Sequence, residues 1–179
     1  SPPVVQWTFI RARESVHGAF TLAETRLACR SGVRARGFHV GAFVDNPAVA
    51  EVLRAGWGYR VEVADVTLSR RYDGTTGRVA GTLETGHTFP IRLSPDDVQF
   101  TATMHAANLD RGLRLLQVER DHDVHQAERG TPFLTSFTHA TLRPSFPVSA
   151  SSARADVTLK PVRYACRPDV SAFEGTEPI

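Results

Sequence analysis

The segment DNPAVAEVLRAGWGYRVE, residues 45–62, says most about the fold of this 179-residue chain. Pro47 is typical of a first helical turn, and either Asp45 or Asn46 is available to cap that turn. The helix is predicted to end near Gly56. Its apolar face is formed by Val49, Val52 and Leu53. A Trp-Gly-Tyr turn then leads into a new strand.

Most of the remaining sequence alternates between apolar and polar residues, which is the pattern of half-buried β-strands. An Asp73-Gly74 dipeptide adds a strong hairpin signal. Strands are predicted over residues 4–11, 19–30, 36–44, 59–72, 78–83, 87–93, 98–105, 112–125, 135–142 and 155–165. This pattern predicts an all-β (β-rich α+β) fold with one short helix. The antiparallel sheet is large enough to form a barrel with an internal cavity, although a sandwich fits the pattern equally well.

Composition limits the possible settings of the chain. No linker or repeat divides it, so we predict a single domain over residues 1–166 and a loose tail over 167–179. It has no apolar run of about 18 residues, which argues against a membrane partner. The first residues lack the pattern of a signal peptide, so a cytoplasmic protein is expected. The net charge is only +2 and the arginines are dispersed, so no nucleic-acid partner is expected.

Three motifs resemble the acetoacetate decarboxylase superfamily. Residues 45–62 resemble its segment D-N-x-P-A-x-A-x-G-R-E-x-W-G-F-P-K-K-L, VHQAERGTP at 124–132 is similar to V-H-E-A-W-x-G-P, and ADVTLKPVRY at 155–164 is similar to A-D-I-x-L-P. The likeness covers residues 4–164. It implies a cone-shaped antiparallel β-barrel around a buried, largely apolar pocket for a small molecule, in a protein that forms homo-oligomers.

The departures from the family pattern bear on the chemistry. The family's first lysine after the W-G-F-P turn forms a Schiff base with the keto substrate, and Val61 and Glu62 stand at its two lysine positions here. The only lysine, Lys160, lies on the closing strand and is expected to be exposed. The resemblance places two family glutamates near Trp7 and Leu22. Glu24 is two residues beyond Leu22 and faces the same way, so it is the candidate pocket acid.

Two residues are therefore candidates for proton transfer, Glu24 and His39. His122 and His125 project to opposite faces of a strand, so neither a metal site nor another cofactor is expected. Candidate substrate-binding residues come from the resemblance and from the strand patterns, and they are Trp7, Leu22, Trp57, Tyr59, Arg60, Val61 and Gln117.

Three functions remain open from the sequence. The chain could be a lyase-type enzyme (decarboxylase, dehydratase or cyclase) that acts on a small keto, enol or polyketide-like acid without an imine. It could be a binding module that carries or senses an apolar metabolite, or a structural oligomer with a vestigial cavity. Glu24 within hydrogen-bond reach of His39 would favour catalysis, whereas an entirely apolar cavity around Val61 and Trp7 would favour binding. A filled cavity would favour the third function.

Overall fold

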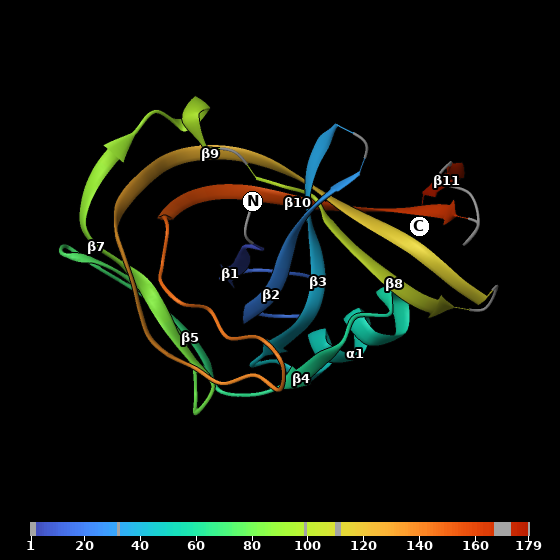
Figure 1. Cartoon of the computed structure of the whole chain (residues 1–179), viewed down its shortest axis with the longest axis horizontal. Helices are drawn as coiled ribbons and strands as arrows, with labels where there is room; N and C mark the ends of the chain where they lie inside the picture. The colour runs from blue at the N-terminus through green and yellow to red at the C-terminus, as the bar shows by residue number, and fades with distance from the viewer. Residues whose placement is uncertain (1–2, 32, 99, 110–111, 167–172, 179) are drawn as a thin grey trace.

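The chain folds into one curved sheet of 11 strands, which curls into a half-barrel (Figure 1). This computed structural model describes residues 3–31, 33–98, 100–109, 112–166 and 173–178. The side chains at 105–121 and 158–178 lie outside this description. No helix in the described part of the chain is long and apolar enough to cross a membrane. The prediction of an all-β fold with one short α-helix is confirmed.

The elements follow one another in this order: β1 (Val5–Ala12), β2 (Phe20–Ser31), β3 (Arg34–Val44), α1 (Pro47–Trp57), β4 (Val61–Val63), β5 (Val66–Arg71), β6 (Gly74–Val79), β7 (Leu83–Leu93), the 3₁₀ helix η1 (Pro95–Asp97), β8 (Thr103–Leu109), β9 (Gly112–Phe137), β10 (Ala150–Cys166) and β11 (Phe173–Pro178). Along the sheet the order is β1-β2-β3-β8-β9-β7-β6-β5, with β4 beside β3 and with β10 between β9 and β11. The pairs are antiparallel except for β3 with β4 and β3 with β8.

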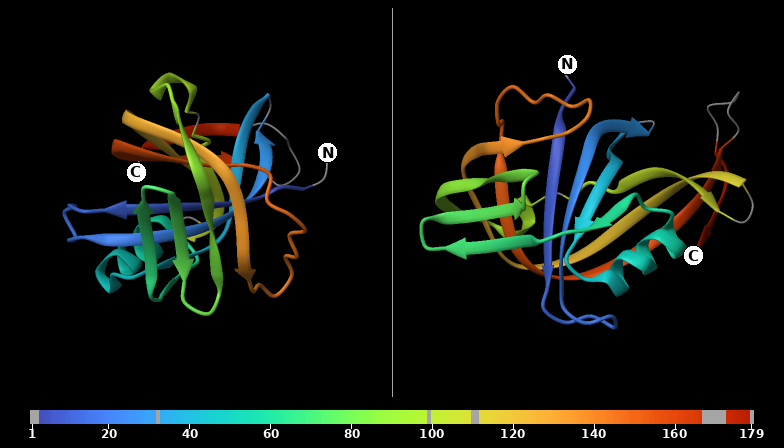
Figure 2. Two further views of the ribbon diagram at one scale, coloured as in Figure 1. Left: turned by 90° about the vertical axis from the view of Figure 1, so that its left-hand side faces the viewer. Right: turned by 90° about the horizontal axis from the view of Figure 1, so that it is seen from below.

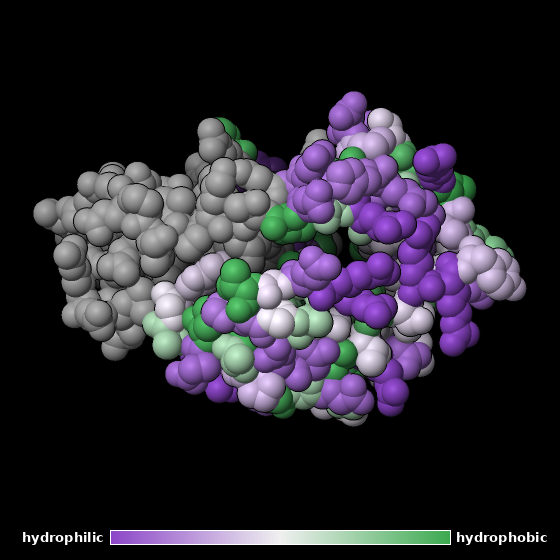
Figure 3. Space-filling model, turned by 180° about the vertical axis from the view of Figure 1, so that it is seen from behind, coloured by the Kyte–Doolittle hydropathy of each residue, from purple (hydrophilic) through white to green (hydrophobic). Residues whose placement is uncertain are grey.

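The 26-residue strand β9 joins the two halves of the sheet. Its first part pairs with β8, and its last part, from residue 127 to 137, pairs with β7. β10 runs antiparallel along much of the same strand, so that the two form long arcs across the molecule (Figure 1). The curl of the sheet leaves a hollow near the middle of the face shown in Figure 3, with largely polar residues around its rim.

Two apolar clusters lie on opposite faces of β1–β3. Leu22 belongs to the cluster that packs with α1, and its neighbour Ala23 belongs to the cluster that packs with β5–β7. Successive residues of a strand point to opposite faces, so the sheet separates the two clusters. The right-hand view of Figure 2 agrees, because α1 and the β5–β6 hairpin lie on opposite sides of β1–β3.

Both ends of α1 are capped, the first by Asn46, one of the two predicted N-cap residues, and the last by Gly58, two residues beyond the predicted end at Gly56. The side-chain oxygen of Asn46 accepts from the backbone N–H groups of Ala48 and Val49, which have no partner within the helix. Gly58 ends the helix in the left-handed conformation, with φ of 65°, and its N–H returns to the carbonyl of Arg54. The Trp-Gly-Tyr turn is therefore the C-cap of α1, and it sets the direction in which β4 begins.

The bounds of most predicted strands differ from those of the structure, and three of the differences have a local physical reason. The strand expected over 59–72 is two strands, β4 and β5, because Ala64 and Asp65 leave the ladder. The return strand expected over 78–83 is β6, which begins earlier, at Gly74. Only two residues separate it from the end of β5 at Arg71, so the hairpin closes directly after β5. The prediction of a strand over 135–142 is wrong beyond Phe137, where β9 ends. His139 Nδ1 accepts there from two backbone N–H groups and forms a turn instead.

The tail was expected to be loose over residues 167–179. Within it, β11 pairs antiparallel with β10 from Phe173 to Pro178, and residues 167–172 lie outside the described residues.

Asn46→Ala tests the helix cap. Asn46 also donates through Nδ2 to the carbonyls of His17 and Ala19, each at 3.1 Å. Loss of the cap and of these two hydrogen bonds should lower the free energy of unfolding by about 1–3 kcal/mol. Equilibrium urea denaturation measures this change. The control is Glu51→Ala, an exposed position in the same helix, which should change the value by less than about 0.5 kcal/mol. An Asn46→Ala protein as stable as this control would contradict the cap.

Candidate functional site

Cross-strand register places the family's lysine position and the candidate acid on one face of the sheet. Thr8, Glu24, Ala42 and Val61 lie directly opposite one another on β1, β2, β3 and β4. Residues directly opposite each other share a face. Neighbouring strands lie about 4.8 Å apart, so Glu24 and Val61 are roughly 10 Å from each other along this row. Glu24 is 1% exposed and Val61 is 5% exposed, so both point into the protein interior.

A β-bulge brings His39 onto the same face. Thr25 is opposite Gly41, but the next pair is Arg26 with His39, so Val40 is an extra residue on β3. Strict alternation from Ala42 would place His39 on the other face, whereas the bulge shifts the alternation by one residue. His39 therefore shares the face of Arg26 and Glu24, and it is buried.

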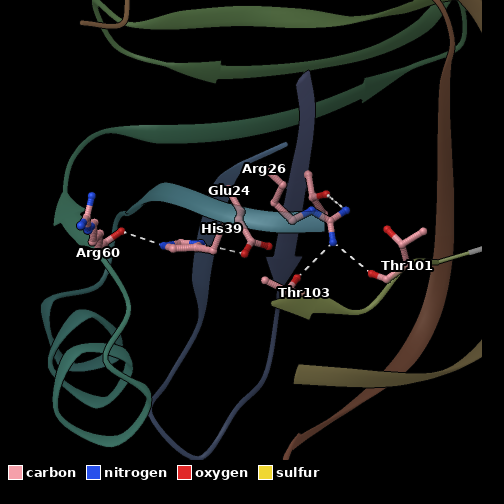
Figure 4. Close-up of polar contacts among 7 residues, drawn as sticks. Glu24, Arg26, His39, Arg60, Thr101 and Thr103 are labelled. Carbon is pink, nitrogen blue, oxygen red and sulfur yellow. Dashed lines mark hydrogen bonds and ion pairs between the residues drawn. The ribbon is translucent and has the colours of Figure 1, made fainter. Parts of the chain in front are cut away.

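Glu24 and His39 form a buried polar pair (Figure 4). Glu24 Oε1 lies 2.9 Å from His39 Nδ1, and His39 Nε2 lies 3.2 Å from the backbone carbonyl oxygen of Arg60. These two contacts hold the imidazole ring from both sides, one from β2 and one from the residue before β4. The contact between Glu24 and His39 is the hydrogen-bond geometry that the sequence analysis set as a condition for proton transfer.

The partners of His39 determine how its protons are arranged. A carbonyl oxygen can only accept, so Nε2 carries a hydrogen and donates it to the carbonyl of Arg60. A bare Nδ1 cannot face a bare carboxylate at hydrogen-bond distance, so one more proton lies between Nδ1 and Glu24. The pair is then either an imidazolium with a carboxylate or a neutral ring with a carboxylic acid. In both forms it holds one shared proton and no net charge.

Aromatic rings from the turn after α1 pack on this pair. The ring of Tyr59 stacks on His39 with centroids 4.2 Å apart and planes at 22°. Trp57 meets Tyr59 edge to face, with centroids 5.8 Å apart. Tyr59 and Val61 are both part of the apolar cluster that includes α1. The site therefore combines one shared proton with an apolar and aromatic surround.

Glu24, His39 and Arg26 form a row of buried polar side chains on this face, the polar row, in which Arg26 lies beyond His39 (Figure 4). Its Nη1 donates to the carbonyl of Thr101 and to the hydroxyl of Thr103, each at 3.0 Å, and its Nη2 donates to the Thr8 hydroxyl at 2.9 Å. Gly37 leaves room for this side chain, because a Cβ there would lie 2.9 Å from Arg26 Cδ. Arg26 thus links β1 and β2 to the start of β8 across the buried face.

The structure brings most of the predicted site residues together. Glu24, His39, Leu22, Tyr59 and Val61 are buried on the α1 side of the sheet, and Trp57 packs against their cluster.

Two other predicted residues are placed differently, and a third is not described. Arg60 offers its carbonyl to the site, while its side chain is exposed. Trp7 lies on the opposite face, where its ring meets Phe137 at 5.0 Å, because it is paired with Thr25 and not with Glu24. The side chain of Gln117 lies outside the described residues.

Arg26 and Thr103 were not among the predicted site residues. Their only sequence signal is weak: Arg26 follows Glu24 by two residues on one strand, so the two were bound to share a face. The segment around Thr103 is 77 residues away from Arg26 in sequence, and its proximity depends on the parallel pairing of β3 with β8.

A possible metal-binding group lies on a different pair of strands. Ligand atoms of Asp123, His125 and Asp156, on β9 and β10, lie within 4.8 Å of one another, and all three side chains are exposed. His125 Nε2 is 3.1 Å from Asp156 Oδ2. These residues are separate from the Glu24–His39 pair.

A second buried histidine, His87 on β7, is 2% exposed. Its Nε2 lies 3.0 Å from the Ser152 hydroxyl, and a Cβ at Gly130 would lie 2.5 Å from its Nδ1. It borders an open pocket of about 260 Å³ that is also lined by Ser69, Arg71, Asp73, Gly74, Thr76 and Thr88. Burial lowers the pKa of His87; nearby Glu128 partly opposes this effect, and Arg70 adds to it.

Comparison with solved structures identifies the fold. No family model matches this chain, and no curated protein matches it by sequence. Among solved structures it has the acetoacetate decarboxylase-like fold, as the sequence resemblance implied.

Acetoacetate decarboxylase from Legionella pneumophila is similar with a TM-score of 0.73 and 21% identity, over 87% of this chain and 70% of that chain. A second acetoacetate decarboxylase gives a TM-score of 0.71 and 18% identity, over 86% and 75%. The enduracididine biosynthesis enzyme MppR, complexed with pyruvate, gives 0.60 and 16%, over 90% and 66%. At these identities the likeness shows the fold alone.

The burial of His87 should make the free energy of unfolding fall at acidic pH. Its pKa is lowered in the folded chain, so the unfolded chain binds the proton more readily. The stability that a neutral, buried His87 contributes is complete at a pH above about 6.5, the pKa of a histidine in an unfolded chain. This stability is lost as the pH falls below that value. Urea denaturation between pH 7 and pH 5 should show a shallower loss of stability for His87→Gln than for the original chain. His17→Gln, an exposed turn residue, is the control. Identical pH profiles for the His87→Gln protein and the original chain would contradict this role.

Proposed function

We propose that this chain binds a small keto or enol compound and moves a proton on it, as a lyase-type enzyme that uses no imine. The observation that carries the proposal is the buried contact of 2.9 Å between Glu24 Oε1 and His39 Nδ1. A buried carboxyl group that shares a proton with an imidazole is suited to general acid–base chemistry. An ordinary core seldom buries such a pair, because desolvation of the two groups costs free energy.

Glu24 is the group that we assign to proton transfer. Both nitrogens of His39 are already directed to protein oxygens, so the histidine acts as a positioning residue. In its carboxylate form, Glu24 takes a proton from the carbon next to the carbonyl of the ligand, and the ligand becomes an enolate. Return of the proton to oxygen or to another carbon gives the enol or a rearranged ketone. A hydroxyl on the next carbon would instead leave as water in a dehydration.

An imine route is not supported by the residues at this site. Val61 stands at the lysine position of the resemblance, and it is buried with no amine to offer. Arg60 carries a guanidinium that stays protonated and is not nucleophilic. The only lysine, Lys160, is on β10, opposite Glu119 in the ladder. Noncovalent binding with proton transfer is therefore the route that the residues favour.

Two similar structures agree with a carbonyl ligand. One is MppR complexed with pyruvate, and another is MppR complexed with the condensation product of pyruvate and imidazole 4-carboxaldehyde. Both complexes involve pyruvate, a keto compound, in the same fold, which supports a keto or enol ligand for this chain.

A non-catalytic binding module for an apolar metabolite is the second candidate. Leu22, Ala42, Tyr59 and Val61 form a buried apolar surface beside the polar pair. In that case Glu24 and His39 would serve only to orient a bound carbonyl group. A homo-oligomer and a cytoplasmic location stay predictions.

Glu24→Gln separates the two candidates. Its amide nitrogen can donate to Nδ1 of a neutral His39 ring, while Nε2 still donates to the carbonyl of Arg60, so the thermal midpoint should stay nearly unchanged, while proton transfer is lost. Turnover of the keto compound should fall by about 100-fold or more. An NMR time course with a mixture of acetoacetate and longer or cyclic β-keto compounds measures loss of each component above its spontaneous rate.

Two variants control this experiment. Glu62→Gln changes an exposed acid next to Val61 and should leave turnover intact. Glu24→Ala removes the partner of a buried histidine and should cost about 3 kcal/mol of stability. Full turnover in a well-folded Glu24→Gln protein would refute the proton-transfer assignment. Binding without turnover in the original chain would favour the binding module.

A further inference from the structure

The open pocket of about 260 Å³ lies on the outer face of the β5–β7 ladder. In this ladder Arg71 is directly opposite Gly74, and Gly74 is directly opposite Thr88, so the three share one face. Residues five positions apart on a strand point to opposite faces. On each of the three strands, the residue five positions from this row belongs to the apolar cluster of the inner face, which includes Val66, Val79 and Leu83.

Gly74 leaves the middle of the row without a side chain. Neighbouring strands lie about 4.8 Å apart, so the backbones of Arg71 and Thr88 are roughly 10 Å from each other across it. No larger residue can fill this gap, because a Cβ at Gly74 would lie 2.1 Å from the backbone carbonyl oxygen of His87. Gly74 is itself buried, so the sheet backbone forms the floor of the pocket.

The side chains around this gap are hydrogen-bond donors. Arg71 carries five N–H groups in a planar fork, and the hydroxyl groups of Ser69, Thr76 and Thr88 can each donate one hydrogen. Ser69 and Thr76 are directly opposite each other in the next row of the same face. Among the described residues, none forms a hydrogen bond or an ion pair with any of these four side chains. The pocket therefore holds one cation and three hydroxyl groups that the described protein does not use.

The neighbouring arginine shows the contrast between the two faces. Arg70 directly precedes Arg71 on β5, so it points to the inner face, where its Nη2 pairs with Glu128 Oε1. Arg71 has the same charge but no such acid among its described neighbours. A planar guanidinium that is free of protein partners suits two oxygens of a carboxylate or a phosphate.

Asp73, in the turn between β5 and β6, also lines the pocket and is exposed. Its carboxylate repels a ligand that is only an anion. The same carboxylate accepts a hydrogen bond from a ligand that carries a hydroxyl group. A ligand that suits both Arg71 and Asp73 therefore combines one oxyanion with at least one hydroxyl group.

We infer that this pocket binds a small hydroxylated oxyanion, either a phosphate ester or a carboxylate. Arg71 holds two oxygens of the anion, the hydroxyl group of Thr88 donates from the other side of the gap, and Asp73 accepts from a hydroxyl group of the ligand. The β5–β6 hairpin lies on the other side of β1–β3 from α1 (Figure 2), so this site is separate from the Glu24–His39 pair and independent of the proposed function. Since the pocket is open to solvent, the affinity should be modest.

An NMR titration of the nitrogen-15-labelled chain tests the inference with glycerol 3-phosphate, glycerate and glycerol. Both anions should shift the backbone amide signals of Gly74, Thr76 and Thr88 along saturable curves with millimolar dissociation constants. Glycerol, which has the hydroxyl groups without the anion, should leave these signals in place. Arg71→Gln should weaken the binding of both anions at least about tenfold. The control is Arg13→Gln, an exposed arginine outside this ladder, which should bind as the original chain does.

Asp73→Asn tests the part assigned to the acid. Without the like charge, inorganic phosphate should bind several-fold more tightly. Glycerol 3-phosphate should gain less, because its hydroxyl group also loses a carboxylate acceptor. An unchanged ratio of the two dissociation constants would overturn the role of Asp73.

The remaining outcomes are distinguishable. Binding of only one of the two anions upholds the inference and shows which oxyanion the pocket prefers. Shifts that do not saturate, or that persist in a well-folded Arg71→Gln protein, would overturn it. Glycerol that binds as tightly as its phosphate ester would overturn it too, because the anion would then add nothing. Each of these results leaves the proposed function standing.

Discussion

The contact between Glu24 and His39 depends on one irregularity of the sheet, the β-bulge at Val40. In a regular ladder, a residue three positions before Ala42 would point to the opposite face from it, and the buried carboxyl group of Glu24 would lack this partner. A carboxyl group buried without a partner costs several kcal/mol. The bulge removes that cost by adding one residue to β3. The same shift sets His39 opposite Arg26, so that the polar row continues to β8.

The rest of the fold holds this row in place. The caps of α1 fix the turn that delivers Tyr59 against His39 and the carbonyl of Arg60 against Nε2. The parallel pairing of β4 with β3 then places Val61 in the same row as Glu24. On the opposite face, a separate apolar cluster packs β1–β3 against β5–β7. The polar pair is therefore supported from both sides by apolar packing, which keeps water away from the shared proton and strengthens its electrostatic interactions.

Local patterns predicted the parts of the fold that depend on neighbouring residues. The helix and its N-cap followed from Asn46 and Pro47, and alternation correctly put Val61 and Glu62 on opposite faces of their strand. Pairings between distant strands have no such signal. The bulge at Val40 is invisible in an alternating sequence, and Trp7 was grouped with the site although its register with Thr25 turns it to the other face. The role of Arg26 likewise depends on threonines that only the assembled sheet brings near.

The arrangement of protons on His39 is the most direct test of this account, since it follows from the two oxygens that hold the ring. Nitrogen-15 NMR of the imidazole side chains at neutral pH, with His39→Gln used to assign the signal, reports which ring nitrogens carry hydrogen. The account predicts that Nε2 of His39 is protonated and donates to the carbonyl of Arg60, with the second proton shared between Nδ1 and Glu24. A bare Nε2, with the ring protonated only at Nδ1, would contradict it.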